Sequence, residues 1–127
     1  MKNLMKHTLW LLLLLPFAAF AQSLQGDWTM QVPDENGNMM LLKLSIGEDA
    51  YTIDFGNDGT PEVKGKYSTE GDQITVQDVE GAMACPADAK GIYKFEVTDT
   101  SMTMTIVKDD CPGRGNPEGK MVFSRAK

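Results

Sequence analysis

Two cysteines are the side chains of this 127-residue chain most able to do covalent chemistry. Cys85 and Cys111 are 26 positions apart, and proline follows each of them, which is typical of loops rather than of the helix N-termini that lower a thiol pKa. A redox role would need a CxxC spacing or a neighbouring cation, and the chain has no CxxC. We therefore predict a structural disulfide, whose loop closure would stabilise the fold by about 3.5 kcal/mol.

Arg114 is an arginine in the same loop as Cys111, beside this predicted bridge. It follows Asp109, Asp110 and Cys111 in the same Gly/Pro-rich segment. One interpretation is an ion pair that orders the loop. The other is a binding group for the carboxylate or phosphate of a ligand, since a guanidinium recognises both through paired hydrogen bonds. Both interpretations stay open at the level of the sequence.

Acidic side chains are the other groups that could serve as metal ligands or as acid–base catalysts. The stretch 54–59 (DFGNDG) offers oxygen ligands, but it lacks the D-x-D-x-D-G spacing and distal Glu of a calcium loop. Pairs such as Asp78 with Glu80, or Asp109 with Asp110, have no spacing that distinguishes them from other surface acids. We expect no metal site, no cofactor and no enzymatic activity.

The N-terminus has the features of a signal peptide. Lys2 and Lys6 precede an apolar run over 9–20, which is too short to span a bilayer, and residues 19–21 (AFA) match the A-x-A cleavage pattern. We predict a signal peptide at 1–21 and a mature domain at 22–127 that starts at Gln22. No second apolar run reaches spanning length, so the mature protein is expected to be periplasmic or secreted.

The composition of the mature chain excludes several functions. The only histidine, His7, lies in the predicted signal peptide. A mature chain without histidine cannot carry out Ser-His or Cys-His catalysis or bind zinc through imidazole. Without Lys2 and Lys6, ten basic residues face 18 acidic ones, a net charge of −8. Such a chain has no basic surface for nucleic acid, and anionic membranes should repel it.

The elements that must position these residues are β-strands, because apolar residues alternate with period two almost throughout. Eight segments follow this pattern: 26–32, 39–46, 50–55, 62–68, 73–79, 91–98, 101–107 and 119–125. Longer loops and tight turns alternate between them. In an up-and-down barrel alternate connections lie at the same end, so the longer loops should share one mouth. There the loops 80–90 and 108–118 would bring the two cysteines together. The fold class is all-β, a small eight-stranded antiparallel barrel.

Several motifs resemble the lipocalin-like (calycin) domain of small bacterial secreted proteins. They are the G-x-W of residues 26–28, Arg125 at the end of the last strand, and the segments 84–86 (ACP), 91–93 (GIY) and 110–114 (DCPGR). The resemblance covers about residues 24–125. It implies that Gly26, Trp28 and Arg125 close the barrel, with the arginine across the indole ring. The chain is shorter than a full-size lipocalin and has no C-terminal helix.

The resemblance also implies the leading function. We expect non-catalytic binding of a small apolar or amphipathic molecule at the barrel mouth, through Tyr51, Phe55, Tyr93, Met104 and Arg114. An eight-stranded barrel either packs its own side chains or holds one small ligand, and we expect the many inward side chains to take most of the interior. The alternative is a periplasmic protein-interaction module, such as an inhibitor of a cell-wall hydrolase, acting through its loops. We expect a monomer in either case.

Overall fold

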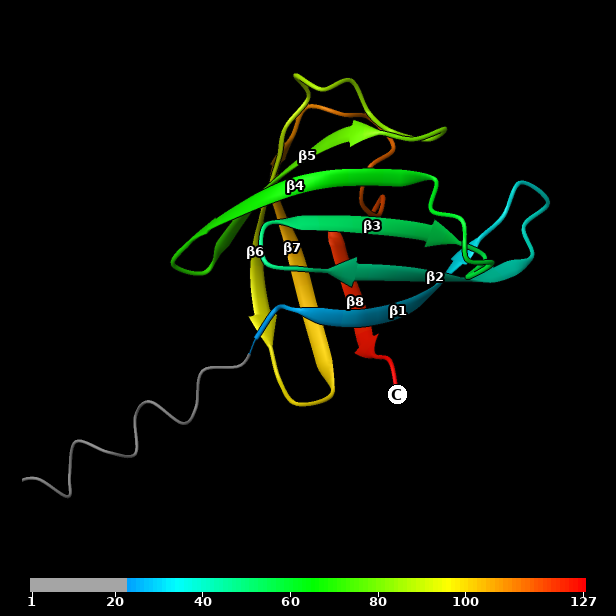
Figure 1. Cartoon of the computed structure of the whole chain (residues 1–127), viewed down its shortest axis with the longest axis horizontal. Helices are drawn as coiled ribbons and strands as arrows, with labels where there is room; N and C mark the ends of the chain where they lie inside the picture. Colours follow the sequence, from blue (N-terminus) through cyan, green and yellow to red (C-terminus); the bar gives the residue numbers. More distant parts are fainter. Residues whose placement is uncertain (1–22) are drawn as a thin grey trace, which may run out of the picture.

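The computed structural model describes residues 23–127, which form a closed antiparallel barrel of eight strands in chain order (Figure 1). The strands are β1 (Gly26–Pro33), β2 (Met39–Ile46), β3 (Ala50–Phe55), β4 (Val63–Glu70), β5 (Gln73–Glu80), β6 (Gly91–Val97), β7 (Ser101–Asp109) and β8 (Lys120–Arg125). The predicted fold class is confirmed. The predicted signal peptide and its cleavage site lie outside the described residues. Within 23–127, no helix is long and apolar enough to cross a membrane.

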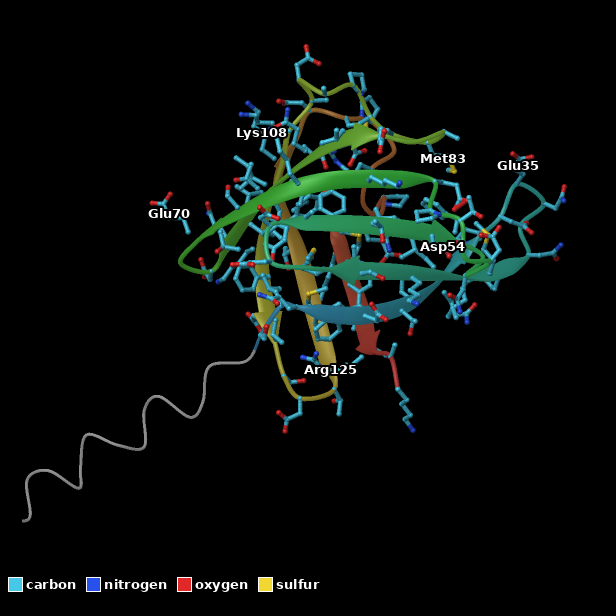
Figure 2. All side chains as sticks on the ribbon, in the orientation of Figure 1. Glu35, Asp54, Glu70, Met83, Lys108 and Arg125 are labelled. Atoms are coloured by element: carbon cyan, nitrogen blue, oxygen red, sulfur yellow. A yellow bond between two sulfur atoms is a disulfide. The ribbon has the colours of Figure 1, made fainter. Side chains whose placement is uncertain are left out.

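The two ends of the barrel differ as the loop lengths predicted. Short turns at 47–49, 71–72 and 98–100 join strands at one end. Four longer loops lie at the other end, which we call the mouth, and β5–β6 (81–90) and β7–β8 (110–119) are the longest. In Figure 2 Met83 and Lys108 mark the side of these loops, and Arg125 lies near the opposite end. The predicted disulfide between Cys85 and Cys111 is confirmed, and it joins the two loops.

The closed end is built around Trp28, whose side chain is completely buried. Its indole Nε1 donates a hydrogen bond to the Leu24 carbonyl at 2.8 Å, and the Arg125 guanidinium lies over the ring at 4.1 Å from its centroid. Trp28 on β1 is also the register partner of Arg125 on β8. The stack therefore lies where the first strand meets the last.

Two β-bulges interrupt the regular pairing near the mouth. On β5 the register passes from Glu80 opposite Lys64 to Asp78 opposite Gly65, which leaves Val79 as an extra residue. On β7 the register passes from Lys108 opposite Ile92 to Ile106 opposite Tyr93, which leaves Val107 unpaired. A bulge changes the direction of the side chains beyond it. Both bulges lie next to carboxylates that face the interior.

Candidate functional site

A cavity of about 950 Å³ occupies the barrel and reaches the loops of the mouth. Its walls are mainly apolar side chains of the strands: Met30, Val32, Leu42, Leu44, Ile46, Ile53, Phe55, Val63, Ile74, Val76, Met104, Met121 and Phe123. The expectation that side chains take most of the interior is therefore wrong. Tyr51 and Tyr93 also line the cavity, and their hydroxyl groups donate hydrogen bonds to carboxylates.

The five residues predicted to bind a ligand all line this one cavity. Tyr51 and Phe55 come from β3, Tyr93 from β6, Met104 from β7 and Arg114 from the β7–β8 loop. Phe55 and Met104 belong to the apolar wall. The other three meet two further side chains in a group of polar residues towards the mouth.

This group, here called the polar cluster, consists of Tyr51, Asp78, Tyr93, Asp109 and Arg114. Arg114 Nε donates to Asp109 Oδ2 at 2.9 Å, and Nη2 donates to Asp109 Oδ1 at 2.9 Å and to the Ala89 carbonyl at 2.6 Å. Its Nη1 lies 3.5 Å from Asp78 Oδ1. The Arg114 side chain is only 11% exposed, and the two carboxylates are almost fully buried. Arg114 thus has the ion-pair role that was one of its two sequence interpretations.

Both tyrosines of the cluster donate to the carboxylates. Tyr51 Oη donates to Asp78 Oδ1 at 2.5 Å, and Tyr93 Oη donates to Asp109 Oδ2. Burial, followed by these hydrogen bonds, raises the pKa of both hydroxyl groups, so the tyrosines remain protonated donors. Gly65 lies between Tyr51 and Asp78 in the sheet, and a Cβ there would be 2.3 Å from Tyr51 Cζ. The glycine leaves room for the ring to cross β4.

The polar cluster is also bonded to the disulfide segment. The Cys85 amide donates to Asp78 Oδ2 at 2.8 Å, and the Cys111 amide donates to Asp109 Oδ1 at 2.9 Å. Burial alone would raise the pKa of Asp109, but hydrogen bonds from Arg114, Tyr93 and the Cys111 amide, with the Arg114 charge, lower it below its usual value. The disulfide and the cluster therefore hold the β5–β6 and β7–β8 loops as one unit.

The sequence analysis did not single out Asp78 and Asp109 as interior residues. A signal existed for Asp78, since it continues the inward alternation of Ile74 and Val76. Asp109 had no such signal, because simple alternation from Met104 points it outward. The bulge at Val107 reverses that direction.

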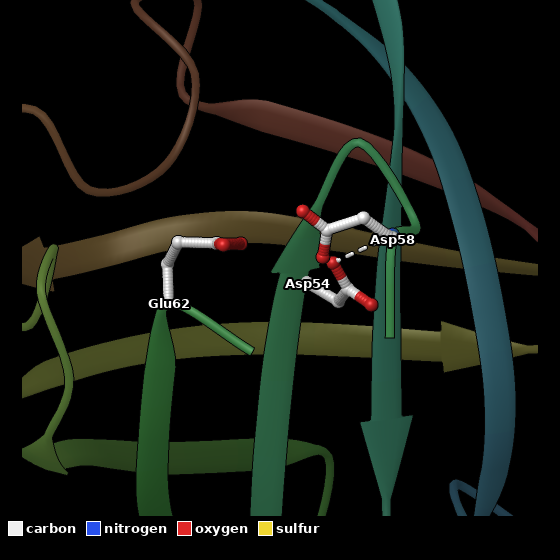
Figure 3. A group of neighbouring side chains, drawn as sticks. All are labelled: Asp54, Asp58 and Glu62. Carbon is white, nitrogen blue, oxygen red and sulfur yellow. Dashed lines mark hydrogen bonds between the residues drawn. The ribbon is translucent and has the colours of Figure 1, made fainter. Parts of the chain in front are cut away.

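A second acidic group, Asp54, Asp58 and Glu62, lies at the β3–β4 loop, with ligand-type oxygens within 4.8 Å of one another (Figure 3). Asp54 accepts the Gly59 amide at 2.8 Å and the Asp58 amide at 3.2 Å. Glu62 accepts the Phe55 amide at 2.7 Å. These bonds explain why the acids gather in this turn. Asp54 is buried, whereas a solvated turn residue would be exposed, because its carboxylate accepts the amide hydrogens of the turn that follows it.

Searches of protein-family models, curated proteins and solved structures find no match to this chain. The fold and the site define its class directly. It is a small disulfide-bonded eight-stranded barrel, consistent with a lipocalin-like fold, with an apolar cavity and a buried polar cluster.

Proposed function

We propose that this chain is an exported, non-catalytic, lipocalin-like protein that binds one small apolar or amphipathic molecule in its barrel. The cavity is the observation that carries this proposal. Ligand pockets of proteins typically measure about 300–1,000 Å³ and combine apolar walls with a few oriented polar groups. The volume of about 950 Å³, the apolar strand walls and the polar cluster match that description.

The compartment is part of the same proposal. A disulfide persists in oxidising environments outside the cytoplasm, and Cys85 is bonded to Cys111. The leader at 1–21 has the pattern of a cleaved signal peptide. Together these features support a periplasmic or secreted binding protein.

The alternative is an interaction module that inhibits another protein through its loops. It would be favoured by a filled barrel with a protruding loop, and Met83 in the β5–β6 loop is indeed 56% exposed. The open cavity favours the binding protein instead. Native mass spectrometry of protein purified from its own host separates the two, since a retained small molecule supports the first and a retained protein supports the second.

A fluorescent titration tests the cavity directly. The neutral dye N-phenyl-1-naphthylamine should bind the wild-type protein and brighten. Val76→Trp places a large ring in the cavity and should weaken dye binding at least about tenfold, equivalent to 1.4 kcal/mol. Val122→Trp is the matched control, because Val122 is 55% exposed on β8 and is not a wall residue. Absence of binding by wild type, or equal binding by both folded variants, would overturn the proposal.

A further inference from the structure

The polar cluster determines which polar group a ligand can bring into the cavity. Within the described residues, Arg114 is the one cationic side chain that lines the cavity. Asp109 and the Ala89 carbonyl occupy its Nε and Nη2 donors. Only Nη1 is left. It is buried and donates no hydrogen bond, although Asp78 Oδ1 lies 3.5 Å away.

A buried donor without an acceptor is unfavourable, so Nη1 is a place where a ligand oxygen would be stabilised. A guanidinium nitrogen can only donate, and therefore the matching ligand group must be an acceptor. Nη1 is covered, so the guanidinium or its loop must shift slightly for the contact to form. The contact would then turn the polar end of the ligand towards the mouth and its apolar part towards the strand walls.

The charge of the acceptor matters because two carboxylates surround this single guanidinium. An oxygen bound to Nη1 would lie close to Asp78 and within the field of Asp109, so an anionic ligand group would be a third negative charge around one positive charge. An alcohol, ketone or ester oxygen accepts the same hydrogen bond without this repulsion. An ammonium group would suit the net charge, but it has no lone pair to offer Nη1.

We infer that the cavity selects a neutral amphiphile, with a hydroxyl, carbonyl or ester oxygen placed at Arg114 Nη1, and rejects the carboxylate of the same chain length. This inference rests on the proposed function, because it names the ligand class of the same cavity. It also reverses the second sequence interpretation of Arg114, in which the guanidinium binds an anionic group.

The test compares ten-carbon ligands at pH 7, each displacing the neutral dye from the wild-type protein. The ligands are 1-decanol, methyl decanoate, decanoate and decylamine. Decanol and the methyl ester should bind at least about tenfold more tightly than decanoate. Asp78→Asn removes one negative charge beside Nη1, so it should tighten decanoate binding about tenfold and change decanol binding much less. Asp72→Asn is the control, since it removes the same charge from an exposed turn at the closed end.

The possible outcomes separate this inference from the function on which it rests. If neither the dye nor any ligand binds, the proposed function fails. If the dye binds but decanoate or decylamine binds as tightly as decanol, the cavity function stands and the inference is overturned. Equal effects of Asp78→Asn and Asp72→Asn on decanoate would also overturn it. The wild-type comparison is decisive by itself if Asp78→Asn does not fold.

Discussion

Trp28 and Arg125 form the contact that joins the first strand to the last. β1 and β8 share only two register pairs, Trp28 with Arg125 and Thr29 with Ser124. The guanidinium adds to this short seam by stacking on the indole and by donating from Nε to the Asp99 carbonyl at 3.1 Å. A cation over an aromatic face contributes about 0.5–2 kcal/mol, depending on its solvation. The Arg125 side chain thus connects β8 to both β1 and the β6–β7 turn.

We predict that Arg125→Ala lowers the free energy of unfolding by about 1–2 kcal/mol, through the lost stacking and the lost packing of the aliphatic stem. Arg125→Lys should recover only part, because a compact ammonium cannot stack on the indole as a planar guanidinium does. Lys66→Ala, on the exposed face of β4, should change stability by less than about 0.5 kcal/mol. Denaturant midpoints measure all three, and wild-type midpoints for both Arg125 variants would contradict the assigned role.

The ion pair of Arg114 with Asp109 should make stability depend on pH. The pKa of Asp109 is lower in the folded chain than its usual value of about 3.9. The carboxylate therefore contributes stability above that pH and loses the contribution as the pH falls through the folded pKa. Arg114→Met leaves Asp109 buried without its partner, and we predict a loss of about 3 kcal/mol at pH 7. The difference from wild type should shrink below about pH 4 in denaturant titrations. A difference that is constant between pH 7 and pH 3 would contradict the prediction.

At the scale of elements, the sequence predicted the strands well and the bulges not at all. Period-two alternation and turn residues are local signals, so they located all eight strands. The extra residues Val79 and Val107 depend on pairing with β4 and β6, which lie elsewhere in the chain. The direction of Asp109, and with it the polar cluster, follows from such a pairing. This is why the apolar wall residues and the inward direction of Asp78 follow from simple alternation, whereas the inward direction of Asp109 does not.

Gly65 on β4 shows how strand and site depend on each other. A Cβ at this position would lie 2.3 Å from Tyr51 Cζ and 2.6 Å from the Gln77 carbonyl oxygen. We predict that Gly65→Ala destabilises the protein by about 2 kcal/mol or more, because the ring and the backbone of β5 must both move. Gly47→Ala is the matched control, since its nearest contact would be an ordinary 3.5 Å to the Ala50 carbonyl. Equal thermal unfolding of the two variants would contradict this account of Gly65.

At the scale of the whole molecule, the barrel has one end closed by short turns and one mouth whose long loops are cross-linked. At the closed end the turns are short and Trp28 fills the interior. At the mouth, the β5–β6 and β7–β8 loops have no regular structure of their own. The disulfide, Arg114 and the amide bonds to Asp78 and Asp109 hold them in place. These cross-links join residues far apart in the chain, so no local sequence pattern specifies how the mouth is arranged.

We therefore predict that removal of the disulfide affects binding as well as stability. The double variant Cys85→Ser with Cys111→Ser should lose up to about 3.5 kcal/mol of unfolding free energy, because the unfolded chain is no longer constrained by a closed loop. At temperatures where it is still folded, its affinity for the neutral dye should fall several-fold, since the β7–β8 loop, which carries Arg114, is no longer tied to the β5–β6 loop. Arg125→Ala is the control for a general loss of stability, because it weakens the opposite end and should leave affinity nearly unchanged. Denaturant unfolding and dye titration on the same samples measure both quantities. An unchanged dye affinity in the double variant would show that the mouth keeps its shape without the bridge.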